Sequence, residues 1–163
     1  MRRWSFILAC TLSATAAAQH VPAAHDLARE ARAAERAGAP LVVFYTQPDC
    51  DYCERARRDY LAPMLGQLHL VEVDVTSSEP LADFSGRRSS QAEFARAQRV
   101  RIVPTLGFYG PEGEPLAAPL VGLTVPDFYL AYLDARLAEA RRHLAPALTS
   151  PPPARATPAT GGG

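Results

Sequence analysis

The sequence predicts an α/β domain in which a mixed central sheet is flanked by helices on both faces. In the first part of the chain, short apolar runs alternate with amphipathic segments, which is typical of parallel strands joined by crossover helices. The last two strand-like runs are separated by Gly110-Pro111-Glu112-Gly113, a turn sequence that indicates a hairpin. The chain has 163 residues, of which 48% are hydrophobic and 21% charged, an ordinary composition for one globular domain with extensions.

The first two elements are a helix and a strand. Residues 22–37 predict a helix because its apolar positions share one face and Gly38 follows at a C-cap position. The apolar positions of this helix are Leu27, Ala31 and Ala34. Residues 41–45, Leu-Val-Val-Phe-Tyr, are typical of a strand buried on both faces.

A second helix and strand follow. Residues 54–65 predict a helix whose end is disturbed by Pro63. Residues 68–75 alternate well enough to be the second strand. Residues 76–88 are polar, contain Gly86, and predict a loop.

The second half of the domain predicts a short helix and then a β-hairpin. Ser90-Gln91-Ala92-Glu93 is a capping box that opens a helix ending near Gln98. Residues 100–109 contain a strand, and residues 116–121 return after the turn. Pro119 indicates that the returning strand lies at an edge or carries a bulge.

The last helix is expected after Thr124-Val125-Pro126-Asp127, which we interpret as its cap. Its expected apolar surface consists of Phe128, Leu130, Tyr132, Leu133 and Leu137. From Pro146 the sequence is rich in proline, alanine, threonine and glycine, which bury too little apolar area to offset the entropy of ordering. We therefore predict a domain at residues 22–145 and a disordered tail at residues 146–163.

The N-terminus predicts a cleaved signal peptide at residues 1–18. Two arginines precede an apolar run that is too short to span a bilayer, and small residues follow at 15–18. The expected mature protein is therefore periplasmic or secreted and not inserted in a membrane. Cys10 leaves a lipid anchor as an open alternative. Cleavage would remove Cys10 and leave Cys50 and Cys53 as the only cysteines.

The charge distribution excludes some function classes. The net charge is zero, so nothing in the composition favours nucleic acid as a partner. All 17 basic residues are arginine, which excludes Schiff-base chemistry on lysine.

The stretch Asp49-Cys50-Asp51-Tyr52-Cys53 admits a metal clamp, a structural disulfide or a redox pair. Structural zinc normally takes four ligands in close pairs, and the later histidines, His69 and His143, are isolated, so we predict no metal site. Copper with one of these histidines stays open. A disulfide across so short a loop removes little unfolded-state entropy, so it would contribute little as a staple.

The position of the pair favours redox chemistry. Cys50 falls where a buried strand ends and a helix begins, and the free N–H groups of a helix N-terminus stabilise a thiolate. Cys53, one turn later, is placed to resolve a mixed disulfide.

Three stretches together resemble the thioredoxin superfamily over roughly residues 25–143. They are the strand, CxxC and helix of residues 41–57, the segment of residues 99–116 around Val103-Pro104-Thr105, and the closing strand, glycine and helix of residues 120–137. The intervening segment at 83–105 is similar to that of exported thioredoxin-related proteins. The resemblance implies a thioredoxin-like fold.

The resemblance also implies roles for individual residues. Cys50 would be the attacking thiol and Cys53 the resolving thiol. Pro104 would be cis beside the disulfide, and the backbone of Val103 would pair with an extended substrate. Tyr52 would also contribute to binding this substrate. The redox-active disulfide needs no further cofactor.

The chain departs from the family's pattern at two positions. The buried acid found six residues before the first cysteine in many members is Phe44 here, and the preceding tryptophan is Asp49. The first departure leaves open how the proton of the second thiol moves. An isomerase's separate dimerisation domain has no space in this chain, so we expect a monomer.

Asp49 and Asp51 flank Cys50 and are expected to raise the pKa of its thiol, because like charges oppose the thiolate. Arg55, Arg57 and Arg58 are expected to point to water. A less stabilised thiolate makes the pair a better electron donor. We therefore expect an exported reductase of protein disulfides, served by a membrane electron donor, and keep a non-catalytic binding module as the alternative.

Overall fold

The computed structural model describes residues 20–149 and has a mixed four-stranded sheet at its centre, with the strand order β2-β1-β5-β6. The strands are β1 (Leu41–Thr46), β2 (His69–Asp74), β5 (Thr105–Tyr109) and β6 (Pro115–Val121). β1 pairs parallel with β2 and antiparallel with β5, and β6 closes the far edge antiparallel to β5. The predicted mixed sheet is confirmed, including the edge position of the strand that carries Pro119.

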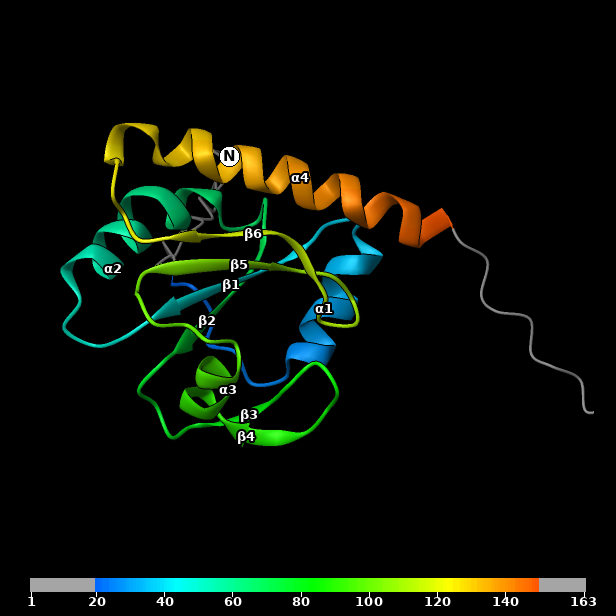
Figure 1. The fold of residues 1–163 in the computed structure, drawn as a ribbon, viewed down its shortest axis with the longest axis horizontal. Helices are drawn as coiled ribbons and strands as arrows, with labels where there is room; N and C mark the ends of the chain where they lie inside the picture. Colours follow the sequence, from blue (N-terminus) through cyan, green and yellow to red (C-terminus); the bar gives the residue numbers. More distant parts are fainter. Residues whose placement is uncertain (1–19, 150–163) are drawn as a thin grey trace, which may run out of the picture.

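Helices cover both faces of this sheet (Figure 1). On one face lie α2 (Asp51–Arg55) and α4 (Tyr129–Thr149). α2 continues without interruption into a π-helical stretch (Ala56–Leu61) and a 3-10 turn (Ala62–Met64) that contains Pro63. On the other face lie α1 (Leu27–Arg36) and α3 (Gln91–Ala97).

The alternation of β1 divides the interior into two cores. Val42 and Phe44 point into the core beneath α2 and α4, whereas Val43 and Tyr45 point into the core beneath α1 and α3. All six residues of β1 are buried. This explains why its sequence is apolar throughout, as expected for a central strand with helices on both sides.

The first helix begins later than predicted. Asp26 caps α1 by accepting a hydrogen bond from the Arg29 N–H at 2.9 Å, so residues 22–25 lie outside the helix. These residues run extended beside β2, where Ala24 donates to the Glu72 carbonyl and Glu72 donates to the Pro22 carbonyl, each at 2.8 Å. Their apolar residues are compatible with an extended segment as well as with a helix. The extended form is favoured because it pairs with the backbone of the edge strand β2.

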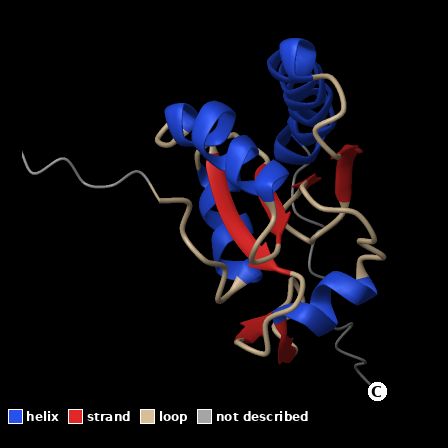
Figure 2. Ribbon diagram, turned by 90° about the vertical axis from the view of Figure 1, so that its left-hand side faces the viewer, coloured by secondary structure: helices blue, strands red, loops and turns tan. Residues whose placement is uncertain are grey.

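Residues 76–88, predicted as a loop, contribute to a second, two-stranded sheet made of β3 (Pro80–Ala82) and β4 (Arg88–Ser90). Asp83 organises its turn by accepting hydrogen bonds from Ser85 and Arg87. Figure 2 shows this small sheet at the end of the molecule opposite α4. The strands are three residues each, too short for alternation to identify them in the sequence.

The predicted capping box of α3 is confirmed. Ser90 Oγ accepts from the Glu93 N–H at 3.2 Å, and the Glu93 carboxylate accepts from the Ser90 N–H at 2.9 Å. The polar side chains at this helix start satisfy backbone donors that have no partner inside the helix.

The last helix differs from prediction in three respects. A 3-10 turn (Pro126–Phe128) precedes α4 without any side-chain cap. The side chains of Phe128, Leu130 and Tyr132 are exposed, and the buried seam is formed by Tyr129, Leu133, Leu137, Ala140 and Leu144. α4 also continues to Thr149, four residues beyond the predicted end of the domain at 145.

The predicted signal peptide at 1–18 lies outside the described residues, as do residues 150–163 of the predicted tail. Within residues 20–149, no helix combines the length and the apolar character that crossing a membrane requires.

Candidate active site

The site centres on a disulfide between Cys50 and Cys53 at the junction of β1 and α2, with the two Cα atoms 5.2 Å apart. Cys50 is the N-cap of α2, and its Sγ accepts a hydrogen bond from the Cys53 N–H at 3.2 Å. Cys53 is completely buried, whereas Cys50 is partly exposed. An approaching disulfide can therefore reach the sulfur of Cys50 but not that of Cys53.

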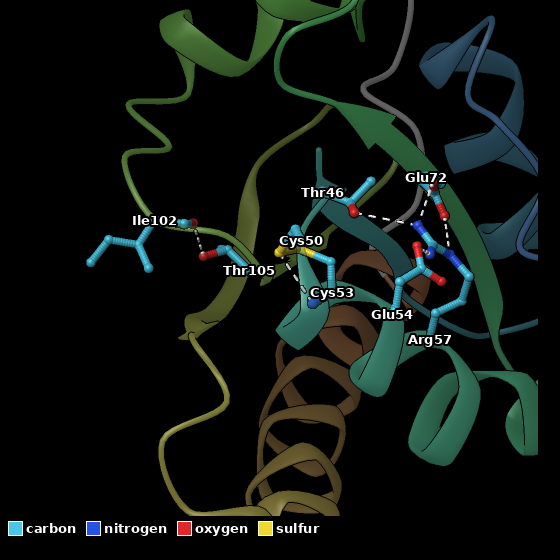
Figure 3. Close-up of a disulfide and its surroundings, with 8 residues drawn as sticks. All are labelled: Thr46, Cys50, Cys53, Glu54, Arg57, Glu72, Ile102 and Thr105. Atoms are coloured by element: carbon cyan, nitrogen blue, oxygen red, sulfur yellow. Dashed lines mark hydrogen bonds and ion pairs between the residues drawn. A yellow bond between two sulfur atoms is a disulfide. The ribbon is translucent and has the colours of Figure 1, made fainter. Parts of the chain in front are cut away.

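A turn from a distant part of the chain lies beside this disulfide. The Val103–Pro104 peptide bond in this turn is cis. The turn is held by two hydrogen bonds: Thr105 Oγ1 donates to the Ile102 carbonyl at 2.8 Å, and the Gly122 N–H donates to the Pro104 carbonyl at 2.7 Å. Val103 and Cys50 pack against the same core, and Figure 3 shows Thr105 next to Cys50. Gly122 has φ +74°, a conformation that favours glycine.

The rim of the site combines acidic and apolar side chains. Asp49 and Asp51, on either side of Cys50, are both exposed. Tyr52, between the cysteines, is 63% exposed, and Ile102 in the facing turn is 57% exposed. Large apolar side chains that remain open to water beside a reactive sulfur are suited to contact with another protein.

An ion pair connects the helical segment that follows the disulfide to β2. Arg57 donates to both carboxylate oxygens of Glu72, at 2.9 and 3.0 Å, and to Thr46 Oγ1 at 3.3 Å. It also contacts Glu54, and its guanidinium carbon lies 5.5 Å from the centre of the Phe44 ring (Figure 3). Burial opposes the charge of Arg57, but the hydrogen bonds and charges of Glu72 and Glu54 outweigh burial and raise its pKa.

The expectation that Arg55, Arg57 and Arg58 all point to water is therefore wrong for Arg57. The side chain of Arg57 is 13% exposed, against 48% for Arg55 and 73% for Arg58. Phe44, which occupies the position of the expected buried acid, is fully buried beneath this guanidinium.

The family model described as a thioredoxin-like domain matches residues 27–137, about two thirds of the chain. The match spans β1, the CxxC pair, the Pro104 turn and the first part of α4. The chain belongs to the thioredoxin-like family.

The chain is also similar to several solved structures. DsbH oxidoreductase aligns with a TM-score of 0.51 at 20% identity, covering 82% of this chain and 95% of its own. A thioredoxin-fold protein from Helicobacter pylori aligns with a TM-score of 0.48 at 17% identity, covering 67% and 84%. The periplasmic thioredoxin SoxS from Paracoccus pantotrophus gives 0.42 at 19%, covering 62% and 98%. Among curated proteins, no sequence matches significantly.

This thioredoxin-like domain brings most of the predicted site residues together. Cys50, Cys53 and Val103 pack in the same core, and Pro104 follows Val103 through the cis peptide bond. Asp49, Asp51 and Tyr52 are exposed around Cys50 at the start of α2. A thioredoxin-like domain that carries a CxxC disulfide in this place supports a thiol-disulfide oxidoreductase.

Sequence reasoning missed Ile102, Thr105 and the Arg57–Glu72 pair. Glu72 carried a usable signal, because it is an acid between two buried valines of β2. Ile102 and Thr105 gave no such signal, since only the fold of the turn places them at the disulfide. Within residues 20–149, no group of three histidine, cysteine or acidic side chains is arranged to hold a metal ion.

Proposed function

We propose that this domain is an exported oxidoreductase that reduces disulfides of client proteins with the Cys50–Cys53 pair. The observation that carries the proposal is the difference in exposure between the two cysteines, because it assigns them different roles. Cys50 is partly exposed at the helix N-terminus, whereas Cys53 is buried beneath it.

The reaction begins from the reduced pair. The Cys50 thiolate attacks one sulfur of the client disulfide, forms a mixed disulfide and releases the other client sulfur as a thiolate. Cys53 then gives up its proton and attacks Cys50, which releases the second client thiolate and leaves the Cys50–Cys53 disulfide. Two electrons pass to the client, and the oxidised pair is the form seen in this structure.

Binding of the client is assigned to the turn facing the sulfurs. An extended client segment would pair with the backbone of Val103 beside Pro104, while Tyr52 and Ile102 contact its side chains. Both side chains are more than half exposed, so they are available to a partner.

The direction of electron flow is proposed from charge. Asp49 and Asp51 disfavour the Cys50 thiolate, and a dithiol with a less stabilised thiolate gives up its electrons more readily. The predicted signal peptide places the protein in the periplasm or outside the cell, so a membrane electron donor would reduce Cys50–Cys53 again. We propose that the domain works as a monomer.

Reduction of insulin by dithiothreitol tests the activity. The wild-type domain should accelerate the reaction, whereas Cys50→Ser should not. In a separate trapping experiment, Cys53→Ala should accumulate a mixed disulfide between Cys50 and the client, which identifies the client. A wild-type rate no faster than that of Cys50→Ser would remove the enzyme assignment. In that case the exposed apolar rim at Tyr52 and Ile102 would favour the alternative, a non-catalytic module that holds a partner.

The equilibrium of the Cys50–Cys53 pair with glutathione tests the direction. A reductase should show a potential close to that of thioredoxins, about −270 mV. A potential near that of enzymes that introduce disulfides, about −120 mV, would contradict the proposed direction.

A further inference from the structure

A hollow of about 430 Å³ lies along β5 and β6, on the face of the sheet opposite α2 and α4. We call it the Arg101 groove. It is bounded by the segment 98–102 on one side and by the alternate residues of β6 on the other. α1 and α3 pack on β1 and β2, so within residues 20–149 no helix packs over this part of the sheet face.

The floor of the groove combines the ring of Tyr109 with small residues of β5 and β6. Gly107 of β5 has no side chain, and a Cβ there would approach the ring of Tyr109 to 2.5 Å, so the ring lies directly over the glycine. Ala117 of β6 also lines the groove. The hydroxyls of Tyr45 and Tyr109 meet at the floor, 2.7 Å apart, and give the apolar hollow a polar base.

The charged residues that line the groove are all positive. Arg99 and Arg101 line it, and none of its lining residues is acidic. Both arginines are exposed, and neither forms an ion pair with a carboxylate of residues 20–149. Arg99 also has φ +58°, a conformation that costs an L-residue energy and that glycine would adopt freely. The groove therefore presents positive charge to a ligand.

The groove begins at the turn that faces the disulfide. Ile102 and Thr105 line the groove and also hold that turn through their hydrogen bond, and Val121 lines it next to Gly122. Figure 3 shows the side chain of Ile102 pointing away from the sulfurs. A chain bound across the turn at Cys50 can therefore continue into the groove without a break.

We propose that the Arg101 groove binds an acidic and apolar segment that flanks the client's disulfide. This inference rests on the proposed function and names its substrate class. Acidic side chains pair with Arg99 and Arg101, and an apolar neighbour enters the hollow against the ring of Tyr109. The acids Asp49 and Asp51 near Cys50 repel the same charge, so the client's acidic residues are directed to the groove side of the turn.

The edge strand β6 favours binding of a client through side-chain contacts over pairing of the client as an additional strand. Pro115 and Pro119 lie in this edge strand and have no N–H to donate. A client segment at this edge loses those backbone hydrogen bonds, and recognition falls to the groove.

Two synthetic peptides with one internal disulfide test the proposal. They differ only in the residues that flank one cysteine, which are Asp-Leu-Asp in one peptide and Arg-Leu-Arg in the other. With dithiothreitol as the electron source, wild type should reduce the acidic peptide with a kcat/KM roughly fivefold higher at low salt, because exposed ion pairs add modestly to binding. This preference for the acidic peptide should shrink in about 0.5 M sodium chloride, because salt screens exposed charges.

Charge reversal localises the effect. The double variant Arg99→Glu/Arg101→Glu should reverse the preference, whereas Arg142→Glu, an exposed arginine on α4, should retain it. In a nuclear magnetic resonance titration with the S-alkylated acidic peptide, which cannot react, amide signals of Arg101, Ile102 and Val121 should shift. An unchanged preference in the double variant, or shifts confined to other surfaces, would overturn the groove as the binding site.

The outcomes separate the two proposals. Equal kcat/KM for the two peptides, with both reduced, would reject the Arg101 groove and leave the oxidoreductase standing. Failure to reduce either peptide or a small aromatic disulfide would reject the proposed function and this inference with it.

Discussion

At the scale of single residues, the two cysteines have different surroundings although they belong to one motif. Cys50 is partly exposed at the helix start and its Sγ accepts a hydrogen bond from the Cys53 N–H, while Cys53 is enclosed by the core beneath α2 and α4. The sequence predicted the helix junction at Cys50, because β1 ends just before it. The difference in exposure follows from that junction. Cys50 precedes the first turn of the helix and is partly exposed, whereas Cys53, in that first turn, faces the core.

Asp51→Asn should lower the pKa of the Cys50 thiol in the reduced protein. The substitution removes a negative charge from the residue after Cys50 and leaves the helix N-terminus in place. The rate of alkylation of Cys50 against pH measures this pKa. Asp127→Asn, an exposed acid near α4, serves as the control, and an alkylation profile equal to that of wild type would show that Asp51 does not act on Cys50.

Tyr45→Phe/Tyr109→Phe should reduce the loss of stability at alkaline pH. Burial raises the pKa of Tyr45 well above its ordinary value, with the charge of Tyr109 and their hydrogen bond adding to the effect, and burial raises the pKa of Tyr109 as well. Because the folded pKa is the higher one, the neutral tyrosines contribute their full stability below about pH 10 and lose it as pH rises further.

Urea unfolding between about pH 8 and 11 measures this effect, since the range brackets the ordinary tyrosine pKa. Burial also raises the pKa of Tyr129, so part of the alkaline loss should remain in the double variant. Tyr52→Phe is the control, because that side chain is exposed. An alkaline profile unchanged from wild type would mean that the pair does not couple to unfolding.

At the scale of elements, the Arg57–Glu72 pair joins the π-helical stretch that continues α2 to β2. Neither side chain is more than 18% exposed, so each depends on the other for compensation of its charge. The sequence did not reveal this pair. On the pattern of residues 54–65 alone, Arg57 is one of three neighbouring arginines, and only the packing of α2 against the sheet turns it inward.

Arg57→Met should destabilise the domain by about 1–3 kcal/mol, because it leaves the largely buried Glu72 carboxylate without its partner. Arg57→Met/Glu72→Met should recover most of that loss, since apolar side chains replace both charges. Arg58→Met, at an exposed pair with Asp59, should change stability by less than about 0.5 kcal/mol. Urea unfolding at neutral pH compares the variants. A double variant no more stable than Arg57→Met would contradict the account of the pair.

At the scale of the whole molecule, the sheet separates two cores, and α4 closes the one that contains the site. Its buried seam packs over β5 and β6 together with Cys53 and Phe44. The position of the disulfide thus depends on a helix that comes last in the chain. The Pro104 turn and the Arg101 groove lie on the same strands that α4 covers from the other face.

Leu133→Ala should cost about 2–5 kcal/mol of stability, because Leu133 is fully buried between α4 and the sheet. Leu130→Ala, on the exposed side of the same helix, should cost less than about 1 kcal/mol. Thermal or urea unfolding distinguishes them. Similar losses in both variants would show that the buried seam of α4 has been misassigned.

Local pattern in the sequence was enough to predict the central sheet, the capping box of α3, the hairpin of β5 and β6 and the place of the CxxC pair. Each of these depends on neighbours within a few residues: alternation or apolar runs for strands, cap residues for helix starts, glycine and proline for turns. The resemblance added the Pro104 turn, which no local pattern assigns to the disulfide.

Only the tertiary structure decided which surfaces of these elements face one another. It placed residues 22–25 along β2, paired β3 with β4, turned Arg57 toward Glu72, and chose Tyr129 and Leu133 over Phe128 and Tyr132 for the core. It also left the floor of the Arg101 groove without a helix from residues 20–149 over it. These outcomes depend on contacts between residues far apart in the chain, whose free energy no single segment carries.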